Sequence, residues 1–157
     1  MTLQKGDKAP SFSLLNTEKK EVKLEDFKGK NLVVHFFPLA FTGVCTAQLC
    51  TVRDAITKYK NDNADVVAIS VDSLFVLDKF KTEQNLSFDL LSDFNKTTSA
   101  AYGALYETFP AFGMQGVSKR SAFVIDKEGV IQYAEVLASP GDLPNFEAIN
   151  ATLAELN

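Results

Sequence analysis

Residues 32–45 read Leu32-Val33-Val34-His35-Phe36-Phe37-Pro38-Leu39-Ala40-Phe41-Thr42-Gly43-Val44-Cys45. The first six form an apolar run, broken only by a histidine, that is typical of a strand buried on both faces of a sheet. Helical spacing starts soon afterwards, so Cys45 is predicted in the first turn of a helix. A thiolate at that position is stabilised by the helix dipole and by free backbone N–H groups. Cys45 is therefore a candidate nucleophile.

The rest of the chain alternates between strand-like and helix-like patterns. Alternating apolar and polar residues predict a hairpin from residues 11–15 and 21–24, ahead of the strand at 31–37. Further strands are predicted at 64–71, 88–91, 120–125 and 130–136. Helices are predicted at 44–62, 72–84, 95–102 and 144–156, with a helical turn at 25–29 and a long aromatic loop at 104–119. This order predicts an α/β protein with a thioredoxin-like fold: a central mixed β-sheet flanked by helices, with an N-terminal β-hairpin.

Composition narrows the class of protein. The 157 residues fit a single domain, 1–157, and the net charge of −4 without a basic run argues against a nucleic-acid partner. No apolar stretch is long enough for a membrane span or a signal peptide, so we expect a cytoplasmic protein. Two cysteines and one histidine are too few for a metal site, and no glycine-rich nucleotide loop is present, so no cofactor is expected. His35, on an apolar strand, is predicted as a core residue rather than a catalytic base.

The two cysteines face different surroundings on the predicted helix. Cys45 shares a sector of the helical wheel with Leu49 and Val52, which is the core side, whereas Cys50 lies roughly 140° away on the polar side. Five helical residues separate the cysteines by about 7.5 Å along the axis, too far for a disulfide. Either the helix unwinds to let them bond, or they never bond. Cys50 as an incidental small residue is the alternative interpretation.

Three other residues around Cys45 are candidates for the same site. Of the two arginines, Arg53 lies eight residues beyond Cys45 and off its face, so Arg120 is by elimination the better cation for a thiolate. A surface arginine is the alternative. The Thr42 hydroxyl can bond the thiolate or a substrate oxygen, cap the helix, or do both. Pro38 removes a backbone donor and can shield the pocket from water, or simply end the strand.

The pattern Pro38-x-x-x-Thr42-x-x-Cys45 resembles the active-site signature of the peroxiredoxins. Further similar segments span most of the chain: Gly6 to Phe12, Leu91-Ser92-Asp93, Ala101-Tyr102-Gly103 and Arg120 to Asp126. The loop from Phe37 to Gly43 looks most like that of the alkyl hydroperoxide reductase E group. Cys50 lies where the peroxiredoxin Q group places its resolving cysteine. Many relatives carry a glutamate where this chain has Gln48.

The resemblance implies a thiol peroxidase for hydrogen peroxide and organic hydroperoxides. Cys45 would be the peroxidatic cysteine that becomes a sulfenic acid, with Thr42 and Arg120 positioning the peroxide and Pro38 shielding the thiolate. Cys50 would resolve the sulfenic acid as an intramolecular disulfide, recycled by a thioredoxin-like donor. Two alternatives stay open. One is a single-cysteine peroxidase resolved by an external thiol, and the other is a non-enzymatic redox-sensing or chaperone-like protein.

Aromatic residues also predict an interface. The loop from 104 to 116 carries Tyr106, Phe109 and Phe112, and Phe41 lies close to the candidate nucleophile. Clustered exposed aromatics usually mark a contact between proteins, so a homodimer through these loops is expected. In the alternative, the aromatics fold back onto the core of their own chain.

Overall fold

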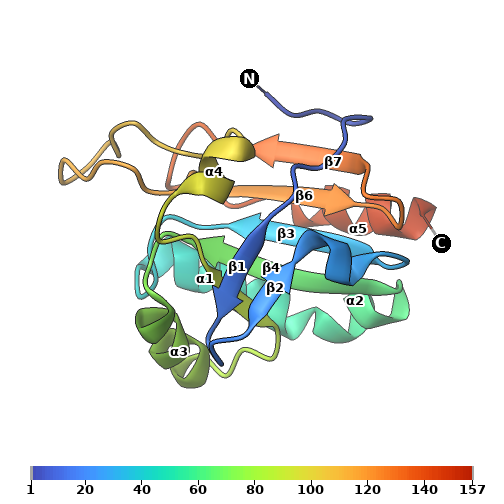
Figure 1. Ribbon diagram of the computed structural model, residues 1–157, viewed down its shortest axis with the longest axis horizontal. Coiled ribbons are helices and arrows are strands. Elements are labelled where there is room, and N and C mark those ends of the chain that lie inside the picture. The colour runs from blue at the N-terminus through green and yellow to red at the C-terminus, as the bar shows by residue number, and fades with distance from the viewer. Residues whose placement is uncertain (1, 157) are drawn as a thin grey trace.

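The computed structural model describes residues 2–156 and contains one seven-stranded mixed sheet in the order β2-β1-β5-β4-β3-β6-β7 (Figure 1). The strands are β1 Ser13–Asn16, β2 Glu21–Lys23, β3 Asn31–Phe36, β4 Ala64–Ser70, β5 Asp89–Ser92, β6 Ser121–Ile125 and β7 Ile131–Val136. The helices are the 3₁₀ turn η1 Leu24–Phe27, then α1 Gly43–Asp54, α2 Ile56–Asn61, α3 Leu74–Glu83, α4 Thr97–Ala101 and α5 Phe146–Glu155. The predicted fold class and N-terminal hairpin are confirmed.

Strand β3 lies near the middle of the sheet because its residues are apolar on both faces. It runs parallel to β4 and antiparallel to β6, and all six of its residues are buried. Strands β4 and β5 are also parallel, so β3, β4 and β5 end at the same edge. The chain leaves β3 at that edge and enters α1. Figure 1 shows the loop of residues 104–119 projecting from the same side of the molecule.

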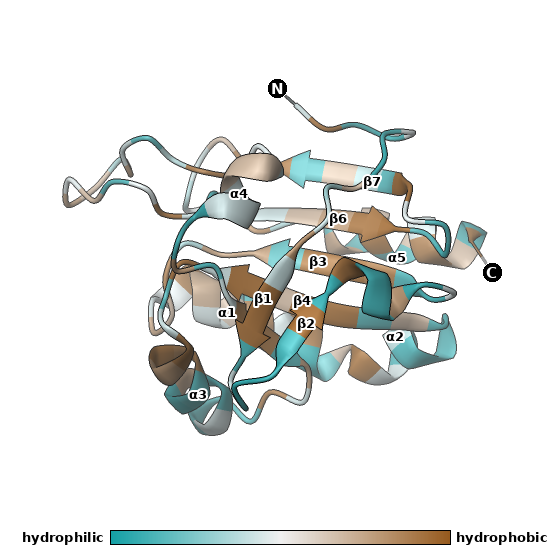
Figure 2. Cartoon of the chain, viewed as in Figure 1, coloured by the Kyte–Doolittle hydropathy of each residue, from teal (hydrophilic) through white to brown (hydrophobic). Residues whose placement is uncertain are grey.

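Two apolar layers sandwich the sheet. Helices α1, α2, α3 and α5 pack on one face, where they meet the odd-numbered positions of β3, beginning with Val33. The other face packs against the N-terminal segment and the residues after α4, with Leu32, Val34 and Phe36 pointing towards them. Figure 2 shows the hydrophobic residues concentrated in the central strands. The period-two alternation of β3 therefore assigns each of its side chains to one layer.

The prediction of one continuous helix over residues 44–62 is wrong. This segment consists of α1 and α2, separated at Ala55, whose N–H is shared between the carbonyls of Thr51 and Val52. After this break, α2 buries Tyr59 against the sheet. Propensity and periodicity do not reveal such a bend, because both halves carry helix-compatible residues. Within residues 2–156, no helix is both long and apolar enough to span a bilayer.

The aromatic loop of residues 104–119 has more structure than predicted. It doubles back on itself, with bridges between Leu105 and Ser118 and between Thr108 and Gln115. A small apolar cluster forms beneath it, where Tyr106 packs with partly buried Phe109. We call residues 104–119 the aromatic arm.

Candidate active site

Cys45 lies in the first turn of α1, on the side that faces the sheet. Its side chain is 1 % exposed and packs in the same apolar layer as Leu49 and Val52. Both predictions made for it, a helix N-terminus and a core-facing side chain, are confirmed. The first-turn N–H groups of a helix have no intrahelical partners, and together with the dipole they favour a negative charge. A buried thiolate at this position is therefore stabilised by the backbone itself.

The loop that leads into α1 is held by the carboxylate of Asp72, two residues after the end of β4. The N–H of Ala40 donates to Asp72 at 2.8 Å, and Asp72 also accepts from the Ser70 hydroxyl. Burial raises the pKa of Asp72, although these two hydrogen bonds work in the opposite direction. Pro38 is buried in this loop, while Phe41 is half exposed in the left-handed region at φ 68°. The geometry fixes the path of the chain between β3 and Cys45.

Thr42 is the N-cap residue of α1, but its side chain does not cap the helix. The hydroxyl donates to the carbonyl of Leu39 at 2.8 Å instead. The alternative in which the Thr42 side chain caps the helix therefore does not hold, and a bond from its hydroxyl to a substrate oxygen stays a prediction. Because the loop turns at Ala40 and Phe41, the carbonyl of Leu39 lies near the hydroxyl and competes successfully for it. Thr42 is exposed, so its hydroxyl remains accessible to a small molecule that approaches the helix N-terminus.

Arg120 points directly at the thiol. It precedes β6, is 2 % exposed, and its Nη1 donates to Sγ of Cys45 at 3.3 Å. The same nitrogen donates to Oε1 of Gln48 at 2.8 Å, and Nη2 donates to the carbonyl of Pro140 at 2.9 Å. No carboxylate of residues 2–156 forms an ion pair with this guanidinium. The group available to neutralise its buried charge is thus the Cys45 thiolate.

Gln48 connects Arg120 to the sheet, which sequence reasoning missed. Its side chain is fully buried, and Nε2 lies 3.0 Å from Nδ1 of His35 and 3.4 Å from the carbonyl of Phe36. The sequence did contain a feature that points to Gln48, because a glutamine three residues after Cys45 falls on the apolar face of α1. The Pro140 carbonyl was missed for a different reason: a backbone group 20 residues beyond Arg120 leaves no trace in the sequence.

His35 is a core residue, as predicted. It is 0 % exposed and lies against the ring of Phe146, and burial lowers its pKa to about 4. It is therefore neutral at ordinary pH. Its hydrogen-bond partner in the site is Gln48, so its part there is to hold that side chain.

Cys50 is on the same helix as Cys45 but does not meet it. Both cysteines are free; Cys50 is half buried and lies 3.5 Å from Oε1 of Gln84, at the end of α3. Arg53 lies nearby and donates to the backbone carbonyl of Gln84 at 2.8 Å. Arg53 is thus engaged away from Cys45, as its place on the helix predicts.

The four candidate interface residues fall into two groups by exposure. Tyr106 is buried and Phe109 is partly buried in their own chain, so the fold-back alternative holds for these two. Phe112, at the tip, is 89 % exposed, and Phe41 is 49 % exposed beside the edge of Phe80. Two aromatic side chains on the active-site side therefore remain uncovered.

Comparison with known families gives a match over residues 5–134 to the model described as the AhpC/TSA family. The chain belongs to the AhpC/TSA family. The matched range includes Pro38, Thr42, Cys45, Cys50 and Arg120.

Individual proteins similar to this chain align with nearly its whole length. Alkyl hydroperoxide reductase E of Mycobacterium tuberculosis is 35 % identical over 156 residues, covering 98 % of each protein. A mouse mitochondrial protein named thioredoxin-dependent peroxide reductase is 37 % identical over 155 residues, which is 92 % of this chain and 56 % of that protein. The crystal structure of peroxidoxin BcpB from M. tuberculosis superimposes with a TM-score of 0.86 at 25 % identity, covering 99 % of both chains. These similarities confirm the resemblance to peroxiredoxins and the thioredoxin-like fold.

Proposed function

We propose that the protein is a thiol peroxidase that reduces hydrogen peroxide and organic hydroperoxides through Cys45. The observation that carries this proposal is the 3.3 Å contact between Arg120 Nη1 and Cys45 Sγ at a buried helix N-terminus. A fixed cation and a helix dipole that converge on one sulfur favour the thiolate, which is the reactive form. The family and the printed names of its members supply the reaction class.

The reaction follows from the groups around the sulfur. The Cys45 thiolate attacks one peroxide oxygen, the O–O bond breaks, and its electron pair leaves on the other oxygen. That oxygen takes up a proton and departs as water or an alcohol, while Cys45 is oxidised to a sulfenic acid. Arg120 stabilises the charge that moves onto the leaving oxygen, and the Thr42 hydroxyl turns from Leu39 to the peroxide. Pro38, buried beside them, keeps bulk water from the sulfur.

The catalytic cycle also needs a reductant, and we propose that Cys50 takes part. In this scheme the Cys50 thiol attacks the Cys45 sulfenic acid, water leaves, and an intramolecular disulfide remains. A thioredoxin-like donor then reduces that disulfide. The family includes a protein named for its dependence on thioredoxin, which supports a thiol donor. Resolution by an external thiol is the alternative, because α1 holds the two cysteines apart.

We further propose that the protein forms a homodimer through the side of the molecule that bears Phe41 and Phe112. Exposed aromatic side chains from two separate loops lie on the active-site side. Aromatic residues dominate the buried centres of protein interfaces. A second copy would cover both rings and would support the loop that precedes Cys45.

The decisive experiment is stopped-flow oxidation of the reduced protein by hydrogen peroxide, followed by turnover with a thiol reductant. Cys45→Ser should show no oxidation and no turnover, whereas Cys50→Ser should retain the first oxidation. Catalytic consumption of peroxide by the wild type separates an enzyme from a redox sensor, which reacts once. Substantial turnover by Cys45→Ser would contradict the assignment.

A further inference from the structure

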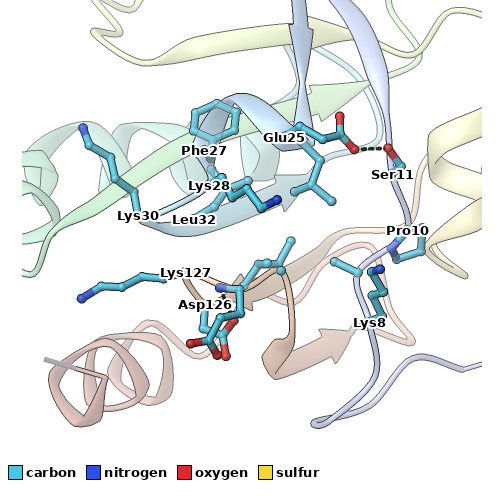
Figure 3. A pocket seen from close by; sticks show the side chains of 15 residues that line it. Lys8, Pro10, Ser11, Glu25, Phe27, Lys28, Lys30, Leu32, Asp126 and Lys127 are labelled. Atoms are coloured by element: carbon cyan, nitrogen blue, oxygen red, sulfur yellow. Dashed lines mark hydrogen bonds between the residues drawn. The ribbon is translucent and has the colours of Figure 1, made fainter.

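A cavity lies at the end of the sheet opposite to Cys45, and nothing in the peroxidase scheme uses it (Figure 3). Its position follows from the register of two strands: Leu32 pairs with Ile125 at the cavity, whereas Phe36 pairs with Ser121 beside Arg120. The cavity measures about 550 Å³. Small-molecule sites usually measure about 300–1,000 Å³, so it is large enough for a ligand.

The cavity has an apolar floor, and backbone hydrogen bonds join the segments that form its walls. Leu24 and Phe27, which are partly buried, supply the accessible apolar surface of the floor, and Leu32 and Ile125, each 1 % exposed, line its base. The walls are residues 8–11, the η1 turn and the β6–β7 turn. Backbone hydrogen bonds from Gly29 to Lys127 and from Ala9 to Gly129 join these walls. Because the fold itself fixes the walls, the cavity exists before any ligand binds, and its floor would take up an apolar group.

Four lysines surround this floor: Lys8, Lys28, Lys30 and Lys127. All four are exposed. Lys30 forms an ion pair with Asp65 at 3.5 Å, but no carboxylate within residues 2–156 pairs with the other three. In Figure 3 the Lys28 side chain extends into the middle of the cavity, and Lys8 lies on the side of Pro10. The ammonium groups of Lys8 and Lys28 form no ion pair within residues 2–156, although Lys28 also attracts the Glu25 carboxylate.

Three acidic residues also line the cavity, and the carboxylates of Glu25 and Asp126 accept hydrogen bonds from its walls. Glu25 accepts from the Ser11 hydroxyl, which lowers the pKa of Glu25. Asp126 accepts from the N–H groups of Glu128 and Val130, and these bonds lower its pKa despite partial burial. The third acid, Glu128, is exposed on the turn. The carboxylates of Glu25 and Asp126 thus stabilise the walls, whereas Lys8, Lys28 and Lys127 form no ion pair within residues 2–156.

We propose that this cavity binds a small amphipathic carboxylate, of which a medium-chain fatty acid is the simplest example. The alkyl chain packs on Leu24 and Phe27, above Leu32 and Ile125, and the carboxylate lies between the ammonium groups of Lys8 and Lys28. Lys127 adds positive potential at the rim, whereas Lys30 is already paired with Asp65. An apolar floor with a cationic rim fits an anion that carries an apolar tail. An uncharged apolar molecule would leave the lysines unused, and a small anion without a tail would leave the floor uncovered. The proposal does not rest on the peroxidase reaction.

The test is a titration of the reduced protein, labelled with ¹³C in its Leu and Ile methyl groups, with decanoate below its micelle concentration. Decanol and inorganic phosphate serve as probes of the tail and of the charge alone. Decanoate should saturate a single site and shift the methyl signals of Leu24, Leu32 and Ile125. Decanol should bind at least about tenfold more weakly, since a lost ion pair with two ammonium groups costs about that much. Phosphate should leave those methyl signals unchanged.

Matched double variants then test the lysines. Lys8→Ala with Lys28→Ala should weaken decanoate binding at least about tenfold. Lys58→Ala with Lys79→Ala removes the same charge from exposed positions outside the cavity and should leave the affinity unchanged. All four side chains are exposed, so an unchanged unfolding midpoint is expected and can be measured. Equal affinity in the two double variants, equal binding of decanol, or shifts confined to methyl groups outside the cavity would each overturn the proposal.

Discussion

Gln48 donates to Nδ1 of His35, and this hydrogen bond fixes the protonation of the histidine. Arg120 can only donate, so the Gln48 oxygen must face Arg120 and its NH₂ group must face His35. Nδ1 is therefore the acceptor, and the ring proton lies on Nε2, which has no partner in the described structure. A second proton on the ring would place an N–H against the NH₂ group of Gln48. Neutral His35 is thus required for the Arg120 contact.

Stability should consequently fall in mild acid because of His35. Its folded pKa is about 4, below its ordinary value of 6.5, so the unfolded chain takes up the proton first as the pH falls. The contribution of neutral His35 to the free energy of unfolding is complete above pH 6.5. It is lost as the pH falls from 6.5 to 4, to a total of about 3 kcal/mol. Denaturant unfolding at pH 7 and pH 5 measures part of this loss. His35→Asn keeps an acceptor but does not titrate, so its stability should change less over that interval; an equal change would refute the linkage.

Gln48 should control the reactivity of Cys45 although it does not touch the peroxide. Gln48→Leu leaves Arg120 Nη1 without its 2.8 Å acceptor. A hydrogen bond to a charged group is worth about 1.5–3 kcal/mol, so oxidation of Cys45 should slow by about tenfold or more. Stopped-flow kinetics provides the rate.

The substitution Gln48→Glu distinguishes positioning from packing. It restores the acceptor for Arg120 but places a carboxylate against Nδ1 of His35, so the pKa of His35 should rise from about 4. Because His35 is the single histidine of the sequence, its NMR titration is easily followed. An unchanged histidine titration would show that position 48 does not contact the ring in solution.

Arg120→Lys should slow the first oxidation by about tenfold or more. Lysine keeps the charge, but one ammonium group cannot reach Cys45, Gln48 and the Pro140 carbonyl with the planar geometry of a guanidinium. Stopped-flow kinetics measures this rate. Arg53→Lys on another face of α1 is the matched control and should leave the rate unchanged. If the two variants behave alike, Arg120 is not the partner of the thiolate.

Much of this arrangement could be predicted from the sequence because the decisive signals are local. The apolar run of β3 and the helical spacing after Pro38 place Cys45 correctly, and the scarcity of arginines leads to Arg120. The period-two pattern of strands and the period-3.6 pattern of helices depend on neighbours in the sequence, so both can be recognised without knowledge of the fold.

The parts that could not be predicted depend on contacts between distant segments. The Gln48–His35 bond joins a helix to a strand, and Asp72 holds Ala40 across 32 residues. Tyr106 turns inward because Val71 and Val117 offer it an apolar surface, which loop composition alone does not reveal. Tertiary packing decides such positions.

The homodimer can be tested at Phe112, whose ring is 89 % exposed. Phe112→Ser should raise the dissociation constant of the dimer at least about tenfold, because a buried interface aromatic is commonly worth 2 kcal/mol or more. Phe75→Ser is a suitable control, since Phe75 is 68 % exposed on α3, away from the aromatic arm. Analytical ultracentrifugation at micromolar concentration gives the masses. A monomeric wild type would contradict the dimer.

The last prediction concerns Cys50 and the stability of α1. Both cysteines lie within Gly43–Asp54, so a bond between them requires this helix to unwind locally. The segment is suited to unwinding: Thr46 and Thr51 hydrogen-bond to carbonyls four residues earlier, which loosens a helix. One equivalent of peroxide should therefore convert the reduced protein to a Cys45–Cys50 disulfide, and amide exchange over residues 44–51 should accelerate.

Intact mass decides between this scheme and the single-cysteine alternative. A disulfide removes two hydrogens from the oxidised wild type, whereas a stable sulfenic acid adds one oxygen. Cys50→Ser should still undergo the first oxidation, since Cys45 carries it out, but should then stall, over-oxidise more readily and recycle poorly with a thioredoxin-like donor. Gain of an oxygen by the wild type, with equal recycling of the wild type and Cys50→Ser by an external thiol, would remove Cys50 from the mechanism. The Arg120–Cys45 contact would then support the peroxidase step alone.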